Sequence, residues 1–187
     1  MRRLIALALI GLALAVPARA MIFTGTLTGT AEVPPNDSPG TGSVTVDMDV
    51  AAHTLSIHAS WAGLLSPTTI AHIHCCTTPS APPATMVPSF TGFPTGVTSG
   101  TYEQTFDTSQ ASSWNPAFVT AAGSVSAAET AFFNGLMAGN AYFNIHTEMF
   151  PAGELRANLA PIPEPSTYAL LLAGLAAVGG MAARRRR

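Results

Sequence analysis

The strongest constraint on the fold is a period-two alternation of apolar and polar residues in the first half of the chain. Residues 43–50, SVTVDMDV, place Val44, Val46 and Met48 on one face and hydroxyl or carboxylate side chains on the other. Residues 53–61, HTLSIHASW, repeat the alternation after a two-residue connection. Because alternate side chains of an extended strand point to opposite sides, this pattern predicts an antiparallel hairpin with one dry face.

Other segments extend this pattern to a whole domain. Further strands are expected at residues 23–32, 68–74, 100–107, 141–148 and 153–159. One helix is expected, because Ser126 and Glu129 form a capping box, an apolar stripe follows, and Gly139 provides a stop signal. A long connection rich in Pro, Thr and Gly covers residues 75–98, and loops of that length are often functional. Many short strands and one helix predict a mainly β fold, an antiparallel β-sandwich.

The first twenty residues predict a secretory signal peptide. Arg2 and Arg3 form a basic start, residues 4–16 are apolar, and residues 18–20, ARA, provide small side chains around a cleavage position. The apolar run is short for a membrane span, so the pattern favours cleavage after Ala20 over a retained anchor.

The other end of the chain has three features in a fixed order. Pro163, Glu164 and Pro165 precede an uncharged apolar run at residues 168–183, and four arginines follow at residues 184–187. The run is long enough to cross a thin bilayer as a transmembrane helix with the arginines in the cytoplasm. This order resembles the PEP-CTERM sorting signal, which implies processing by an exosortase; a plain single-span anchor is the alternative. Either way, the sequence predicts export.

Between these segments lies one domain, residues 21–160, followed by the sorting signal at residues 161–187. A domain of this size can bury a core without disulfides. Residues 21–162 contain one basic residue, Arg156, no lysine and nine acidic residues, which gives a net charge of −8. A domain this acidic repels phosphate backbones and attracts cations, so nucleic acid is not expected as a partner.

Two blocks of sequence resemble the CHRD domain family. The first is SWAGLLSPTTIAHIH at residues 60–74, and the second is LMAGNAYFNIHTEMFPAGELRANL at residues 136–159. The resemblance extends over residues 23–159. It implies an immunoglobulin-like β-sandwich, and it implies this fold more firmly than any function.

A shorter segment is similar to part of another family. GLLSPTTIAHIH, residues 63–74, resembles the Cu/Zn superoxide dismutase strand that carries two copper-binding histidines, and His146 lies on a late strand, as another copper ligand does there. No dense cluster of His and Asp follows the HIH strand, so a zinc site has no evident source. Nucleophile-elbow, phosphate-loop and HExxH motifs are also absent. We therefore expect a protein that is not an enzyme.

Three histidines are candidates for a shared metal site. His72 and His74 are one residue apart and therefore share a strand face, and His146 lies in a later strand. If the two strands are neighbours, three imidazoles converge, and imidazole suits copper and zinc. The alternative is that these histidines only hydrogen-bond to nearby polar groups, and His53 and His58 are assigned to that role.

Three charged residues are expected around this site. Glu148 or Glu154 can supply an oxygen ligand or fix the tautomer of a histidine ring from outside. Glu154 and Arg156 lie two residues apart on one strand face and are expected to form an ion pair, with Glu148 across the hairpin as another partner for Arg156. An exposed pair contributes less than about 1 kcal/mol.

Cys75 and Cys76 are the only cysteines and follow His74 directly. Export favours disulfides, and the only internal pairing is a vicinal disulfide, which would end the HIH strand in a tight turn. Adjacent residues of a strand point apart, so both thiols cannot join the histidines without a turn. Binding of Cu(I) by the thiolates and pairing with another chain are the alternatives.

Two functions follow from these observations. The first is an exported, non-catalytic binding or structural module that passes through an inner-membrane-anchored intermediate to the cell surface or the extracellular matrix. Its expected partners are the exosortase, the export machinery and extracellular polysaccharide. The alternative is a small metalloprotein that holds copper or zinc through His72, His74 and His146 and has redox activity.

Overall fold

The computed structural model describes residues 20–162, 173–175 and 178. Its strands and helices, in chain order, are β1 (Met21–Thr28), β2 (Thr41–Asp49), β3 (Thr54–Ala62), β4 (Thr68–Cys75), β5 (Gly100–Asp107), α1 (Pro116–Ala122), α2 (Val125–Met137), β6 (Ala141–Thr147), β7 (Leu155–Asn158) and β8 (Ala160–Pro161). Short 3₁₀ turns follow β1 and β5, at Gly29–Ala31 and Ala111–Ser113.

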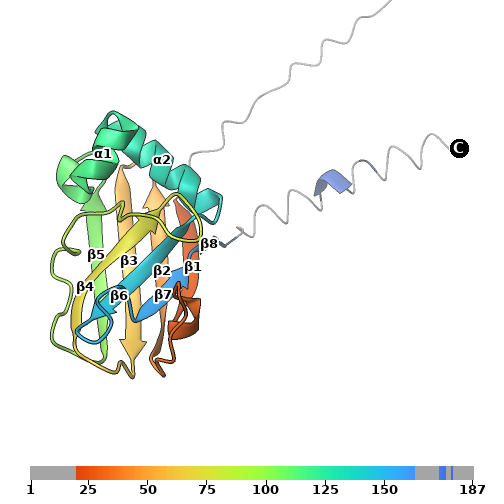
Figure 1. The fold of residues 1–187 in the computed structure, drawn as a ribbon. Coiled ribbons are helices and arrows are strands. Elements are labelled where there is room, and N and C mark those ends of the chain that lie inside the picture. The colour runs from red at the N-terminus through yellow and green to blue at the C-terminus, as the bar shows by residue number, and fades with distance from the viewer. Residues whose placement is uncertain (1–19, 163–172, 176–177, 179–187) are drawn as a thin grey trace, which may run out of the picture.

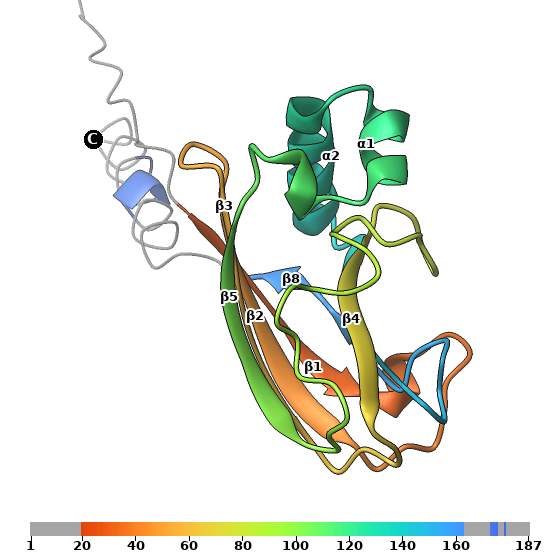
Figure 2. The same ribbon diagram turned by 90° about the vertical axis from the view of Figure 1, so that its left-hand side faces the viewer.

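The strands form one antiparallel sheet in the order β4-β6-β7-β1-β2-β3-β5, and β8 pairs with β1. The predicted hairpin of β2 and β3 is present, with Val46 opposite Ile57 in its register. The sheet curls so that its two edge strands, β4 and β5, lie on opposite sides of the core (Figures 1 and 2). The predicted fold class, mainly β and antiparallel, is confirmed, and a single curled sheet supplies both layers of the expected sandwich.

The long connection between β4 and β5 covers the outer edge of β4. Its backbone amides donate to strand carbonyls: Phe90 to Ala71 at 3.0 Å and Ala84 to Ile73 at 2.9 Å. The Phe90 ring also packs between the two sides of the curl, 5.9 Å from the rings of both Tyr102 and Phe143. The connection therefore pairs an exposed strand edge and closes the core at the same time.

The core lies inside the curl. The alternating apolar residues of β2 and β3 point into it, as the period-two pattern predicts. Its largest fully buried side chains are Trp114, Phe23, Phe132, Phe143, Leu27, Met48, Leu55, Ile57, Ile73, Leu136, Ile145 and Leu155. Trp114 follows the 3₁₀ turn at Ala111–Ser113, and the others come from every strand from β1 to β4, from β6 and β7, and from α2, so one core holds the domain together.

The two helices cover one end of the curled sheet (Figure 1). The sequence predicted only α2, although Asn115-Pro116 before α1 and the left-handed Gly123 after it are ordinary start and stop signals. The expected capping box is wrong, because Ser124 caps α2 by accepting a hydrogen bond from the Ala127 amide. Glu129 is turned inward instead.

The Glu129 carboxylate ties α2 to the strands below it. It accepts hydrogen bonds from the Thr108 hydroxyl and from Nδ1 of His53, which lies at 2.9 Å. His53 sits in the β2–β3 connection, so this contact joins the helix layer to the sheet. A carboxylate committed to these tertiary partners is unavailable for a cap on its own helix.

Both export segments fall largely outside the described residues. The expected signal peptide covers residues 1–20, of which only Ala20 is described, and most of the expected transmembrane helix at residues 168–183 is likewise not described. Within the part of the chain that is described, no helix has the length and apolarity to span a membrane.

Candidate metal centre

The three candidate histidines lie together on one face of the β4–β6 pair. The two strands are antiparallel, with Ile70 paired to His146 and His72 paired to Asn144, so His146 lies diagonally beside His72. The ring centroid of His72 is 4.9 Å from that of His74 and 4.8 Å from that of His146. One ring nitrogen of each histidine lies within 4.8 Å of those of the other two.

Loops bury this face from outside. Every residue of β6 is buried, so the strand is covered on both faces and not only on the core side. His72 is 4% exposed and His146 is 7% exposed, while His74 is partly buried. The imidazole cluster is therefore shielded from bulk water. The outer face of a sheet is usually exposed to solvent, and this one is not.

Backbone carbonyls decide which ring nitrogens carry protons. Nδ1 of His74 donates to the Ala81 carbonyl at 2.7 Å, and Nδ1 of His146 donates to the Pro151 carbonyl at 2.8 Å. Since a carbonyl only accepts, Nε2 of each neutral ring keeps a free lone pair. Nε2 of His74 lies 3.1 Å from Nδ1 of His72. Nε2 of His146 is buried and has no hydrogen-bond partner among the described residues.

The three rings are neutral at physiological pH. Burial, together with the neighbouring His146 and His74 rings, lowers the pKa of His72 to about 3. Burial lowers the pKa of His74 to about 4, despite the hydrogen bond to Ala81. Burial also lowers the pKa of His146. Neutral imidazole is the form that ligates metals, so the cluster needs no deprotonation before binding.

Tyr142 supports His74 from the neighbouring strand. The two rings stack at 4.6 Å with an interplanar angle of 7°, and the Arg156 guanidinium carbon lies 3.5 Å from the centre of the Tyr142 ring. The Tyr142 hydroxyl donates to the Ala81 carbonyl at 3.2 Å, the same carbonyl that holds His74. Arg156, which the sequence placed near the site, therefore touches it only through Tyr142.

The predicted ion pair between Glu154 and Arg156 is wrong, because no such pair exists in the described part of the chain. Nε of Arg156 donates to Asn158 Oδ1 at 3.0 Å. Glu154 is fully buried, and its carboxylate accepts three hydrogen bonds, from Ser38 Oγ, the Leu65 amide and Thr147 Oγ1. Glu154 thus joins three connections of the fold and does not face a cation.

Neither predicted carboxylate belongs to the histidine group. Glu148 follows β6 and is exposed, and the group whose ligand atoms converge contains only His72, His74 and His146 among the described residues. The expectation that Glu148 or Glu154 orients a ring is also not met, since backbone carbonyls do this. The site is therefore an all-imidazole cluster without a carboxylate.

Sequence reasoning missed two buried polar residues beside the cluster. Asn144 lies opposite His72, and its Nδ2 donates to Oε1 of Glu32. Burial raises the pKa of Glu32 to about 7, and the charge of Arg156 opposes that change. The shared strand face of Asn144 and His146 pointed to Asn144, whereas nothing near Glu32 indicated a buried carboxyl group.

The two cysteines lie away from the histidines. Cys75 and Cys76 are joined as a vicinal disulfide. Cys75 is 2% exposed and follows His74 in β4, so its side chain points to the opposite, core face. The sulfurs pack on α2 at Gly135, where an added Cβ would overlap Cys75 Sγ. In this arrangement the sulfurs do not reach the imidazole group.

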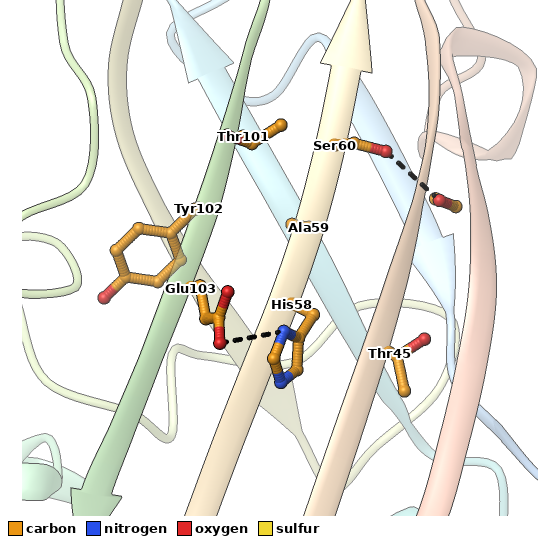
Figure 3. Close-up of a pocket in the computed structure, with 8 residues that line it drawn as sticks. Thr45, His58, Ala59, Ser60, Thr101, Tyr102 and Glu103 are labelled. Carbon is orange, nitrogen blue, oxygen red and sulfur yellow. Dashed lines mark hydrogen bonds and ion pairs between the residues drawn. The ribbon is translucent and has the colours of Figure 1, made fainter.

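The remaining histidines behave as surface or bridging residues. Figure 3 shows a shallow hollow on the outer face of β2, β3 and β5, where His58 Nδ1 lies 3.7 Å from Glu103 Oε1. Both side chains are well exposed, and an exposed pair of this kind contributes little. His53 contacts Glu129, as described above. Among the described residues, neither histidine belongs to a group whose ligand atoms converge.

Two family models match this chain, one over the domain that holds the histidines and one over its C-terminal segment. The model of the CHRD domain matches residues 23–159, which include every strand from β2 to β7 and the whole histidine cluster. The chain belongs to the CHRD domain family. The PEP-CTERM protein-sorting motif matches residues 161–187. This CHRD domain is therefore part of an exported protein that an exosortase sorts to the cell surface. No curated protein and no solved structure matches the chain.

The lowered histidine pKa values predict that the metal-free CHRD domain loses stability as the pH falls from about 6.5 toward 4. In this range the unfolded imidazoles, with an ordinary pKa of 6.5, bind protons that the folded His72 and His74 exclude. The raised pKa values of Glu32 and His53 act in the opposite direction. A group whose pKa is higher in the folded state contributes folding stability at low pH, and that contribution is lost as the pH rises.

Because these effects oppose each other, the test compares the pH dependence of the unfolding free energy between the wild type and a histidine variant. The unfolding free energy of the chelator-treated protein is followed from pH 7 to pH 4.5 for the wild type and for His72→Gln. The wild type should show the steeper acid loss, by up to about 1.4 kcal/mol per pH unit. Parallel curves would contradict a lowered pKa at His72.

Proposed function

We propose that this exported CHRD domain binds one copper or zinc ion through His72, His74 and His146. The observation that carries the proposal is Nε2 of His146, which is buried beside two other neutral imidazoles and has no partner among the described residues. Buried polar atoms without partners are uncommon, and each one calls for an explanation. A metal ion at the centre of the three rings would satisfy it.

The distances suit a small ion. His74 Nε2 and His72 Nδ1 are 3.1 Å apart, close to the roughly 3.3 Å that separates two tetrahedral ligands bonded at about 2.0 Å. The three ligand atoms lie within 4.8 Å of one another, so the rings would have to close by up to about 1.5 Å around the ion. Ca²⁺ and Mg²⁺ are disfavoured, because they need several oxygen ligands and this group contains no carboxylate.

The surroundings match what a histidine site requires. Two of the rings have their Nδ1–H fixed by backbone carbonyls, those of Ala81 and Pro151. Such outer hydrogen bonds hold the ring orientation and raise the basicity of the ligating nitrogen. Stacking on Tyr142 restrains His74 as well. Three protein ligands would leave one coordination position open, as in catalytic metal sites.

Metal analysis of the purified exported protein tests the proposal. After chelator treatment and titration with Cu²⁺ or Zn²⁺, the wild type should retain one ion per chain, and metal should raise its melting temperature. His146→Leu removes the unpartnered Nε2 and should weaken binding at least 100-fold. His58→Leu is the matched control on an exposed strand position and should bind like the wild type.

Two results would contradict the metal assignment. One is a protein that keeps no metal above background and melts identically with and without chelator. The other is equal binding by His146→Leu and His58→Leu, which would place any bound ion elsewhere. Thermal unfolding of each metal-free variant separates lost ligation from lost folding.

A second candidate is a non-catalytic adhesion or matrix module that contacts extracellular polysaccharide. A hydroxyl-rich outer face of the sheet favours it, formed by Thr24, Thr26, Ser43, Thr45, Ser56, Ser60, Thr101 and Thr105. Cross-strand pairs such as Ser56 and Thr105, 2.8 Å apart, order these hydroxyls, which can donate to and accept from sugar hydroxyls. This module would remain if the metal analysis failed, and membrane anchoring before exosortase cleavage fits either candidate.

A further inference from the structure

The side-chain amide of Asn144 is the second unexplained buried group on the histidine face. Asn144 is 2% exposed, and its Oδ1 has no hydrogen-bond partner within the part of the chain that the structure describes. In the described residues, only Asn144 Oδ1, His146 Nε2 and Trp61 Nε1 share this condition. Two of these three atoms therefore belong to alternate residues on one face of β6, next to His72.

The orientation of the amide is determined by its donors. Nδ2 of Asn144 donates to Oε1 of Glu32 and to the Leu155 carbonyl at 3.5 Å. The Leu155 carbonyl can only accept, so the nitrogen and not the oxygen of the amide faces it, and the ionised Glu32 carboxylate accepts from the same nitrogen. Leu155 lies on β7, and β6 runs between β7 and β4. Oδ1, the other end of the amide, is not engaged by these acceptors, and the residue paired with Asn144 on β4 is His72.

Close packing holds the amide in this orientation. Gly153 has a φ of +133°, and a Cβ at that position would overlap both Asn144 Nδ2 and Glu32 Oε1. Because Gly153 has no side chain, the β6–β7 connection packs directly against the Glu32–Asn144 pair. Rotation of the amide would place its oxygen against the Leu155 carbonyl oxygen and is disfavoured.

We propose that Asn144 Oδ1 accepts a hydrogen bond from a water molecule in the fourth coordination position of the metal held by the three histidines. This inference rests on the proposed function and specifies the ligand of the same site. An acceptor beside the open position selects ligands that carry a proton, such as water or hydroxide. It disfavours anions without a proton, because their lone pairs face those of the amide oxygen.

Azide is a suitable probe, because it is small, anionic and without a proton. In the Cu²⁺-loaded protein, or the Co²⁺-loaded protein if only zinc-type binding occurs, azide binding is followed by the ligand-field spectrum. Asn144→Leu removes the acceptor at similar size and should bind azide at least tenfold more tightly than the wild type. Glu148→Gln changes an exposed carboxylate outside the histidine group, and so it should bind azide like the wild type.

Water-proton relaxation in the Cu²⁺ form reports the bound water itself. The wild type should show relaxation enhancement from an exchanging inner-sphere water, and azide should remove it. Absence of this enhancement would mean that Asn144 ligates the metal directly or that the position is closed, and either result overturns the inference.

The outcomes separate the two proposals. A protein that loads one metal but shows equal azide affinity in the wild type and Asn144→Leu overturns the role of Asn144 and leaves the histidine site standing. A protein that loads no metal overturns both. Asn144→Ala, which only removes atoms, serves as a second variant if the leucine form does not fold, and the same tenfold gain is expected.

Discussion

Replacing Glu154 with alanine should lower the free energy of unfolding by about 3–5 kcal/mol, one of the largest losses available to a single substitution in this domain. The carboxylate is fully buried and accepts hydrogen bonds from the Ser38 hydroxyl at 2.6 Å and from the Leu65 amide and Thr147 hydroxyl at 2.7 Å. These donors lie in the β1–β2, β3–β4 and β6–β7 regions. Alanine would leave all three donors without their shared acceptor, and the Thr147 hydroxyl among them is fully buried, which costs more than the loss of an average hydrogen bond.

Chemical denaturation of the wild type and three variants measures this loss. Glu154→Gln keeps one carboxyl-type oxygen and places an amide near hydroxyls that can accept, so its loss should be about half that of alanine. Glu148→Gln changes an exposed carboxylate six residues earlier and should fall within about 0.5 kcal/mol of the wild type. A loss below about 1 kcal/mol for Glu154→Ala would contradict a structural role for this carboxylate.

Replacing Gly135 with alanine should destabilise the domain by about 1–3 kcal/mol, although alanine is the better helix former by about 1 kcal/mol. Gly135 lies inside α2, and its missing Cβ leaves room for the disulfide of Cys75 and Cys76. An alanine methyl would overlap Cys75 Sγ and lie 2.7 Å from Cys76 Sγ. Two sulfurs bonded to each other cannot move apart independently, so helix and strand must separate instead.

A double-mutant cycle tests this explanation through a change of sign. In a background that carries Cys75→Ala and Cys76→Ala, the sulfurs are gone, and Gly135→Ala should become neutral or stabilising because only helix propensity remains. Thermal or chemical unfolding of the four proteins provides the comparison. Equal destabilisation in both backgrounds would show that the glycine is required for another reason.

The strands and the pairing of the histidines were predictable because period-two alternation acts locally. Side chains at positions 72 and 74 share a face in any extended strand, and one antiparallel pairing of β4 with β6 is enough to bring His146 beside them. The order of the motifs along the chain also suffices to predict a mainly antiparallel fold. These conclusions depend on backbone geometry and not on the paths of the loops.

The roles of the charged residues were not predictable, because they depend on connections that bury an outer strand face. Alternation placed Glu154 and Arg156 together on a solvent-exposed side, whereas the surrounding loops enclose Glu154 and supply its donors. Glu129 was assigned to a helix cap by spacing, and it serves a tertiary contact with His53 instead. Spacing rules describe neighbours in sequence and contain no information about such distant partners.

The carbonyl partners of the histidine rings show the same limit. Ala81 and Pro151 lie in irregular segments, and their residue types have no side-chain polarity that would attract notice. Any residue could provide these carbonyls if the backbone follows the same path. The protonation pattern of the site is therefore encoded in loop conformation, which a single sequence does not reveal.

The pairing of Phe23 with Pro161 means that the domain begins and ends at one pole. Exosortase processing after β8 would therefore act at the same pole at which β1 begins. The histidine cluster is level with Thr28 and Arg156, a pair about five residues, or roughly 17 Å, further along β1. A tether at either terminus would therefore hold the domain by the same pole and present the same side of the curled sheet outward.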